Sequence, residues 1–498
     1  MDQGRARSGW AGCGPAGILG LRGGATALVV LLGLARWAAG QTADAVILGE
    51  SVPRGTASRV RIELKAHGLF RPPLPPDKMA PGAKMPKPMA LDVQTRLIFN
   101  ERVIGLAGDR TANGTSRGQA AGGATRGKPA RVVRHVMQAA SAINGAKGEI
   151  RPMTAVLRPE VALLVAERSS ADGSVVVFSP AGPLTRSELE VVQGVGDPLA
   201  IADILPTGPV RPGQSWRVGE TAARGISQYD AITANTLDAL LESVDPTRAA
   251  VRLHGRIEGS LQGARGLMTC DGVLIFDRRR GWIERLELNR NESRRPGPIE
   301  AGLDVKSTLT FTRVTENPPA TLSDAALARA SLETTPQRLW LTQDSPDGKA
   351  QLLHHRRWHV FWEDPKVVVL KRLDGSRVVA QCNLVVGPPA GRGRHQDPVQ
   401  FRDEVRRVLG QRFVQFLGTG TVGGDPAGGF RFKVGVQGRE GDLGVVWYYY
   451  LVAGPEGDQL VVTYTLAARD AQTFGDQDAE MIGTLRWRQP RQADARRR

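Results

Sequence analysis

Apolar and polar residues alternate along most of this chain, in short runs separated by turn residues. In the run 59–65, for example, Val60, Ile62 and Leu64 fall on one side of an extended backbone. This two-residue period is typical of a strand that buries one face and exposes the other. The pattern predicts further strands before and after residue 316, at 91–104, 131–142, 163–167, 174–179, 236–244, 249–258, 270–276, 282–289 and 305–314, and at 358–362, 367–371, 378–386, 414–421, 430–437, 445–452 and 460–466.

Three helices are predicted between these strands. Thr185 and Glu188 have the spacing of a capping box, in which each side chain satisfies a backbone N–H of the first turn. Asp397 precedes a proline and a stripe of apolar residues that Gly410 ends, which is the arrangement of an N-cap and a C-terminal glycine. A third helix is expected to begin near Asp470.

The order of elements predicts an α+β, β-rich chain with more than one domain. We expect a curved antiparallel sheet or half-barrel over residues 41–315, with six or more strands and one or two short helices, in which the pattern from Leu205 onward is β again. A linker over 316–346 leads to an α+β domain over 347–490, followed by a basic tail, 491–498. In the second domain helices pack onto a mostly antiparallel sheet.

The amino-terminal segment has its own pattern. An apolar run, 25–35, follows a basic leader and precedes the small residues Ala38 and Gly40. The run is shorter than the roughly 20 apolar residues that cross a bilayer. It predicts a secretory signal peptide over residues 1–40, cleaved before Gln41. We therefore expect a periplasmic or extracellular protein; the alternative is a membrane anchor formed by the uncleaved leader.

The net charge of +16 comes from 55 arginines and 11 lysines against 50 acids. The arginines are interleaved with acids, as in 402–407, whereas a nucleic-acid surface needs clustered cations and stacking aromatics. We expect a solvated basic surface and no nucleic-acid partner. Contact with an anionic envelope polymer or a lipid headgroup is the alternative.

The sequence provides no motif for a reaction. His355 and His359 have the spacing of a helical zinc pair, but the acid of that motif is missing and the segment runs into a strand. Cys270 and Cys382 occur in apolar, strand-like runs, so we expect two buried free thiols, with a disulfide as the alternative. We therefore expect no catalytic residue, no metal site and no cofactor.

Two family resemblances follow from particular segments. The aromatic strand 446–450 and the ending 485–487, with the order of elements over 357–488, resemble the PsbP/DcrB-like α/β sandwich. That resemblance implies an accessory or binding protein. The segments 182–189 and 205–216 are similar to exported proteins of unknown function from planctomycete-type bacteria. The predicted half-barrel is loosely similar to the LolA/LolB type, which implies a lipid carrier.

Five aromatic residues are candidates for ligand binding. Trp216, Phe276 and Trp282 could line a cavity in the half-barrel, and Trp447 and Tyr449 share one face of a strand and could line a groove. Plain core packing is the alternative for all five. The sequence thus predicts an exported, non-catalytic envelope module for binding or scaffolding. A carrier of lipid and a hydrolase-type enzyme are the alternatives. The expected partner is an envelope lipid, an anionic polymer or a protein, with membrane contact only through an uncleaved leader.

Overall fold

The computed structural model describes residues 44–71, 87–109, 125–145, 153–423 and 429–488. The predicted leader, 1–40, and the basic tail, 491–498, lie outside the described residues. Ala45–Arg498 forms one compact unit. Of the helices described, none combines the length and the apolar character that a membrane span requires.

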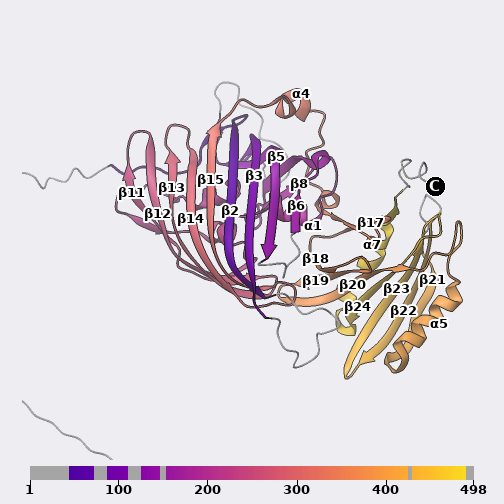
Figure 1. The fold of residues 1–498 in the computed structure, drawn as a ribbon. Helices are drawn as coiled ribbons and strands as arrows, with labels where there is room; N and C mark the ends of the chain where they lie inside the picture. The colour runs from indigo at the N-terminus through magenta and orange to yellow at the C-terminus, as the bar shows by residue number, and fades with distance from the viewer. Residues whose placement is uncertain (1–43, 72–86, 110–124, 146–152, 424–428, 489–498) are drawn as a thin grey trace, which may run out of the picture. The chain divides into compact units, whose positions relative to one another are not determined.

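The larger sheet is antiparallel and open (Figure 1). Its main path runs β8-β7-β5-β3-β2-β15-β14-β13-β12-β11-β9, and it has thirteen strands including β6, which pairs with β5, and β10, which pairs with β12. This confirms the antiparallel sheet predicted for the first region. The strands are β2 (Ala57–Arg71), β3 (Met89–Leu106), β5 (Pro129–Gly145), β6 (Met153–Val156), β7 (Leu163–Arg168), β8 (Val175–Phe178), β9 (Ser215–Arg217), β10 (Ala231–Asn235), β11 (Asp238–Val244), β12 (Arg248–Leu261), β13 (Ala264–Asp277), β14 (Trp282–Arg294) and β15 (Gly302–Thr315).

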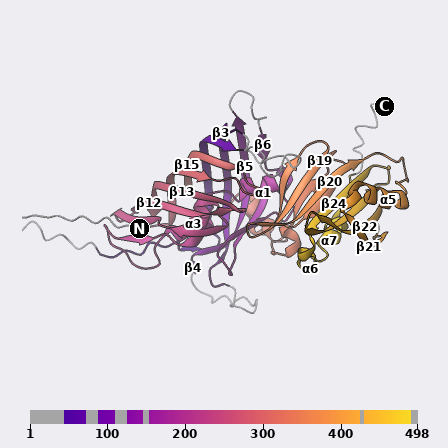
Figure 2. The same cartoon turned by 90° about the horizontal axis from the view of Figure 1, so that it is seen from below.

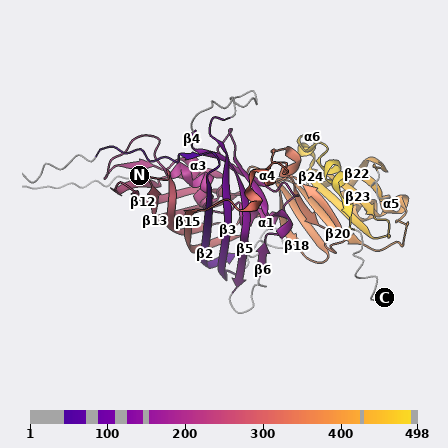
Figure 3. The ribbon, with the colours of Figure 1, turned by 90° about the horizontal axis from the view of Figure 1, so that it is seen from above.

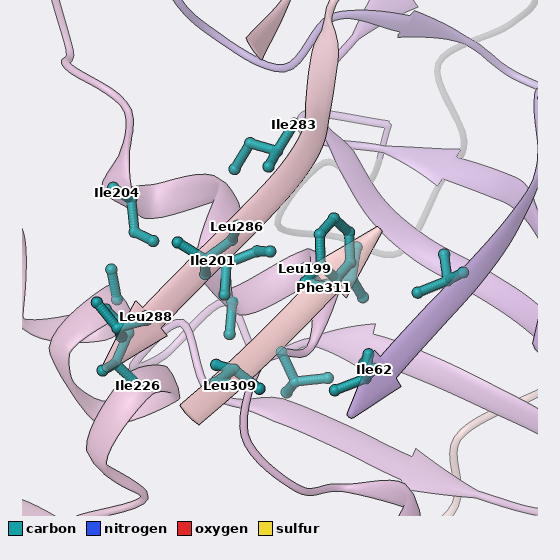
Figure 4. Packing of buried hydrophobic residues seen from close by; sticks show 14 of the residues in the cluster. Ile62, Leu199, Ile201, Ile204, Ile226, Ile283, Leu286, Leu288, Leu309 and Phe311 are labelled. Atoms are coloured by element: carbon teal, nitrogen blue, oxygen red, sulfur yellow. The ribbon is translucent and has the colours of Figure 1, made fainter. Parts of the chain in front are cut away.

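Three helices cover the apolar face of this sheet: α1 (Arg186–Val192), α2 (Pro198–Ile201) and α3 (Glu220–Ser227). Figure 4 shows Leu199 and Ile201 of α2 and Ile226 of α3 packed against side chains of β14 and β15. The capping box predicted at Thr185 and Glu188 is present at the start of α1. The expectation that the pattern is β again from Leu205 onward was wrong for 220–227, because α3 is a helix whose buried side chains are small except for Ile226.

The second sheet has seven antiparallel strands in the order β18-β19-β20-β24-β23-β22-β21. The predicted succession of three strands, a helix, four strands and a helical end is confirmed. One face packs against α5 (Pro398–Leu409) and the other against α7 (Gln477–Thr484), both of which are labelled in Figure 2. The strands are β18 (Trp358–Glu363), β19 (Val367–Asp374), β20 (Arg377–Gly387), β21 (Phe413–Thr421), β22 (Phe430–Glu440), β23 (Leu443–Ala453) and β24 (Gln459–Ala467).

The helix predicted from Asp470 is in fact two helices, α6 (Ala471–Phe474) and α7, because Gly475 adopts a positive φ of 58° between them. A small sheet of β16 (Leu341–Asp344), β17 (Ala350–His354) and β25 (Arg486–Trp487) completes this part of the chain. A two-stranded pairing of β1 (Val52–Pro53) with β4 (Arg126–Gly127) accompanies the larger sheet.

The segment between the two regions, 316–346, packs against the larger sheet. It includes the short helix α4 (Asp324–Leu327), which is labelled in Figure 3 beside β3 and β5. Leu322 and Leu327 are buried in a small apolar cluster with residues of β5, β7 and β8. Arg102 of β3 donates a hydrogen bond of 2.8 Å to the carbonyl oxygen of Leu322. The segment is therefore fixed to the sheet by both packing and hydrogen bonding.

Candidate ligand-binding site

Two of the five candidate aromatic residues lie inside the core of the larger sheet. Phe276 and Trp282, at the adjacent ends of β13 and β14, are 2 % and 3 % exposed. The guanidinium of Arg313 lies 5.4 Å from the centre of the Trp282 ring. Both rings are thus enclosed by protein groups, which is the core packing given above as the alternative.

Trp447 and Tyr449 lie on one face of β23, as their spacing predicts. Trp447 is buried among side chains of α5 and β22, and the half-buried Tyr449 packs against the same cluster. Tyr448 and Tyr450 belong to the cluster on the opposite face, beside α7. Helices therefore cover both faces of this strand, and ligand binding at Trp447 and Tyr449 stays a prediction.

Trp216 differs from these four residues because its half-buried side chain lines a hollow of about 590 Å³. We call this depression the Trp216 hollow. Its volume lies within the range of small-molecule sites, roughly 300–1,000 Å³. Its walls combine apolar and polar side chains, namely Leu205, Pro206, Pro209 and Val210 with Thr207, Gln214, Arg217, Thr221, Lys128 and Asp203.

The Trp216 indole is fixed in place by the backbone. Its Nε1–H donates a hydrogen bond of 2.8 Å to the carbonyl oxygen of Ile204, and β9 pairs Trp216 with Ala239 of β11. The indole also packs against the core of the larger sheet. A ring anchored at its edge and lining a hollow presents a rigid surface, which loses little conformational entropy when a ligand binds.

Another part of the wall is a proline-rich loop, 205–214, which is held by the segment that precedes the first long strand. Val46 and Val210 exchange two backbone hydrogen bonds, of 2.8 and 2.9 Å. Inside the loop the Gln214 side chain accepts a hydrogen bond from the backbone N–H of Arg211. The backbone N–H of Gly213 donates to the carbonyl oxygen of Leu241 at 2.8 Å. These bonds give the loop a defined shape.

The charged groups of the Trp216 hollow are already paired. One carboxylate oxygen of Asp203 contacts the ammonium group of Lys128, and the other accepts a hydrogen bond of 2.5 Å from Arg168. Arg217 donates to Asp238 at 2.6 Å. Because each charge has a partner of opposite sign, the hollow offers hydrogen-bonding groups without a strong field for an ionic ligand.

Glu50 also lines the Trp216 hollow, but its carboxylate is directed into the core. It accepts hydrogen bonds from the backbone N–H of Ile283, at 3.2 Å, and from Arg313, at 2.9 Å. Burial raises the pKa of Glu50, and the neighbouring Arg313 counteracts this effect. The carboxylate is therefore a member of a buried charge network and has no access to a ligand in the hollow.

The remaining candidates for chemistry are buried or dispersed. Cys270 and Cys382 are free and buried, which confirms the prediction for both thiols. Burial raises the pKa of Cys270 to about 12, so its thiol is a poor nucleophile. In the part of the chain that the structure describes, no three His, Cys, Asp or Glu side chains are grouped so that they could hold a metal ion.

Sequence reasoning found Trp216 but missed its neighbours Lys128, Asp203 and Gln214. For Gln214 the only signal was its place in the segment 205–216, and no pattern in the sequence pointed to Lys128 or Asp203. Lys128 and Asp203 are 75 residues apart in sequence, and their contact depends on how β4 and the end of α2 meet.

The fold and the hollow define a β-rich α+β protein with open antiparallel sheets and a partly apolar ligand-sized depression. No protein-family model matches the chain, and no curated protein does. Among solved structures, cyanobacterial PsbP from Synechocystis sp. aligns at 13 % identity and a TM-score of 0.23, over 30 % of this chain and 92 % of that chain. A lipovitellin structure aligns at 9 % identity and a TM-score of 0.28, over 54 % of this chain; the aligned part spans about a quarter, 26 %, of the lipovitellin chain.

Proposed function

We propose that this chain is an exported, non-catalytic binding module, and that the Trp216 hollow binds a sugar ring of an envelope saccharide. The observation that carries the proposal is the anchored, half-buried indole on the wall of a hollow of about 590 Å³. The face of an aromatic ring is negative and attracts the weakly positive C–H groups of a pyranose. Gln214, Thr207 and Thr221 supply amide and hydroxyl groups beside the ring for the sugar hydroxyls.

Binding is favoured over catalysis because the carboxylates that line the hollow are held in ion pairs and hydrogen bonds. General acid–base chemistry requires a carboxyl group that can exchange a proton with the substrate. Both oxygens of Asp203 are occupied by Lys128 and Arg168, and the Glu50 carboxylate is held in the core by Arg313. The hydrolase alternative therefore has no free acid on this wall.

The lipid-carrier alternative is less favoured, because the apolar face of the larger sheet is covered by the chain itself. Leu199, Ile201 and Ile226 from the helices fill the space against Leu288 and Phe311 of the strands, as Figure 4 shows. A carrier needs an apolar cavity large enough for an acyl chain. Here the apolar surface is used for folding.

Two parts of the proposal, export and the division into domains, rest on the sequence. The predicted leader over 1–40 supports export. The order of strands and helices after residue 357 supports a PsbP/DcrB-like sandwich, which we propose as an accessory domain over residues 347–490. The larger domain, 41–315, would then contain the ligand site, with 316–346 connecting the two.

Isothermal titration of the full chain with the neutral oligosaccharides chitotetraose and cellotetraose tests the ligand class. We expect saturable binding of at least one tetrasaccharide, and at least a tenfold loss of affinity in Trp216→Ala, because removal of a central aromatic residue commonly costs about 2 kcal/mol or more. Trp216→Phe should lose less, since it keeps an aromatic face.

Trp362→Ala is the matched control. Trp362 is also half-buried and its Nε1–H is bonded to Asp364 at 2.9 Å, but it belongs to β18 of the second sheet. We expect the affinity of the Trp362→Ala variant for the tetrasaccharides to be unchanged. If Trp216→Ala fails to fold, Gln214→Ala, at an exposed position of the same wall, should weaken binding. Absence of saturable binding, or equal affinity in all variants, would overturn the proposal.

A further inference from the structure

A second set of hollows lies on the solvent face of the larger sheet and shares no lining residue with the Trp216 hollow. Three depressions of about 500, 400 and 550 Å³ adjoin one another over β2, β15, β14, β13 and β12. They share several polar residues, so they form one continuous feature. We call it the polar trough and define its centre by Lys65, His67, Lys306, Thr308, Asn289 and Asn291.

The strand register places these side chains in two rows across the sheet. In one row His67 pairs with Lys306, which pairs with Asn291. In the next row Lys65 pairs with Thr308, which pairs with Asn289. Residues two apart in a strand point to the same face, so both rows face solvent, while Leu64 and Leu309, next to Lys65 and Thr308 in their strands, face the core.

Lys65 and Lys306 differ from the cations around the trough. Arg96 pairs with Glu63 at 2.7 Å, Arg285 with Glu287 at 2.7 Å and Arg252 with Glu242 at 3.0 Å. Within the residues that the structure describes, neither lysine forms an ion pair, and both are exposed. They occupy diagonal positions on neighbouring strands, about 7 Å apart by the geometry of a sheet. Two unpaired cations this close favour an anion between or beside them.

The other groups in the trough indicate what kind of anion fits. Thr308 donates a hydrogen bond to Asn289 at 2.9 Å, and Asn291 donates one to Thr269 at 3.4 Å. These amide and hydroxyl groups keep further donors and acceptors for a ligand. No Phe, Tyr or Trp lines the described trough, which disfavours stacking of nucleic-acid bases. A depression also fits a chain better than the flat surface of a bilayer.

We propose that the polar trough binds an acidic polysaccharide, with Lys65 and Lys306 contacting its carboxylates and the Asn and Thr side chains contacting its hydroxyls. This surface is independent of the Trp216 hollow and extends the ligand from a single sugar unit to a polymer. The two sites can fail separately, because one depends on an aromatic ring and the other on two ammonium groups.

The test measures retention of the full chain on immobilised polygalacturonate as the ionic strength rises. We expect retention to weaken with salt, since exposed charges are screened within about 10 Å at 0.1 M. Lys65→Ala/Lys306→Ala should reduce affinity by at least about tenfold at low salt and flatten the salt dependence. Lys65→Gln/Lys306→Gln, which keeps a hydrogen-bonding group, should show the same loss and serves if the alanine variant is unstable.

A control with the same net charge is Lys366→Ala/Arg439→Ala, at two exposed positions, one between β18 and β19 and one in β22. We expect its retention to stay within twofold of the unaltered chain. Binding of tetrasaccharides at Trp216 should be unchanged in the trough variants. Salt-independent retention, equal losses in the control, or stronger retention on phosphatidylglycerol vesicles than on polygalacturonate would overturn the proposal.

Discussion

The guanidinium of Arg134 donates two hydrogen bonds to the carboxylate of Asp197, of 2.6 and 2.9 Å, inside the core of the larger sheet. Arg134 belongs to β5, and Asp197 is the N-cap of α2, where it also accepts a hydrogen bond from the backbone N–H of Leu199. Arg134 makes a further ion pair with Glu101 at 2.9 Å. A single buried cation thus fixes α2, and with it the loop that forms the Trp216 hollow, to the sheet.

Replacement of Arg134 by Met should destabilise the fold strongly. It would leave the carboxylate of Asp197 buried without its cation, and Glu101 with only the longer contact to Arg313, at 3.7 Å. Breaking a buried pair in this way costs about 3–5 kcal/mol. Urea unfolding followed by circular dichroism measures the effect. Arg217→Met is the control, because the Arg217–Asp238 pair is about half exposed, and such pairs contribute roughly 0–1 kcal/mol. Equal losses in the two variants would contradict the role of Arg134.

Gly272 allows β13 and β14 to approach each other. A Cβ atom at this position would lie 2.2 Å from the carbonyl oxygen of Glu287, so the strands would have to separate. We expect Gly272→Ala to lower the free energy of unfolding by about 1–3 kcal/mol, as overpacked positions do. Gly418→Ala in β21, where a Cβ would meet no atom within 4 Å, should change it little. Urea unfolding compares the two variants. An unchanged free energy of unfolding in Gly272→Ala would contradict the close approach of β13 and β14.

The two thiols should be unreactive in the folded protein. Cys270 and Cys382 are 3 % and 0 % exposed, and burial raises the pKa of both. In a Cys13→Ser variant of the chain, Ellman's reagent at pH 8 should detect no thiol under native conditions and both thiols in strong urea. Rapid reaction of either cysteine without denaturant would show that the packing around its thiol opens in the folded protein.

Most strands of this fold could be predicted because each buries one face, and the two-residue period survives in the local sequence. The start of α1 was predictable for a similar reason, since the two hydrogen bonds of the capping box join Thr185 and Glu188 within one turn. Helix α3 was not, because it is short and Ile226 is the only large apolar side chain that it buries beside Ala222 and Ala223. The break at Gly475 requires a positive φ that no pattern of apolar residues reveals.

The candidate sites depend on contacts between distant segments, so the sequence predicted them only in part. Trp216 was a candidate because an aromatic residue stands out by itself. The polar trough could not be predicted, because it depends on the register that places Lys65 of β2 diagonal to Lys306 of β15. A shift by one residue would have directed these lysines into the core.

Stability should fall in mild acid because of His354. This side chain is fully buried, and burial, reinforced by the neighbouring Arg186 and His355, lowers its pKa to about 4, although a hydrogen bond with the His355 carbonyl oxygen acts in the opposite direction. In the unfolded chain the pKa is near the ordinary 6.5. Between these two values the unfolded state binds a proton that the folded state does not.

The free energy of unfolding should therefore decrease as the pH falls from about 6.5 to about 4, by roughly 1.4 kcal/mol per pH unit for this group alone. His359, whose pKa burial lowers to about 3, should contribute in the same direction. Urea unfolding at pH 7.5, 6, 5 and 4.5 gives the slope. His354→Leu should reduce that slope by close to one proton, because it removes the titrating group and keeps an apolar side chain in its place. An unchanged slope in this variant would show that His354 becomes protonated within the folded protein.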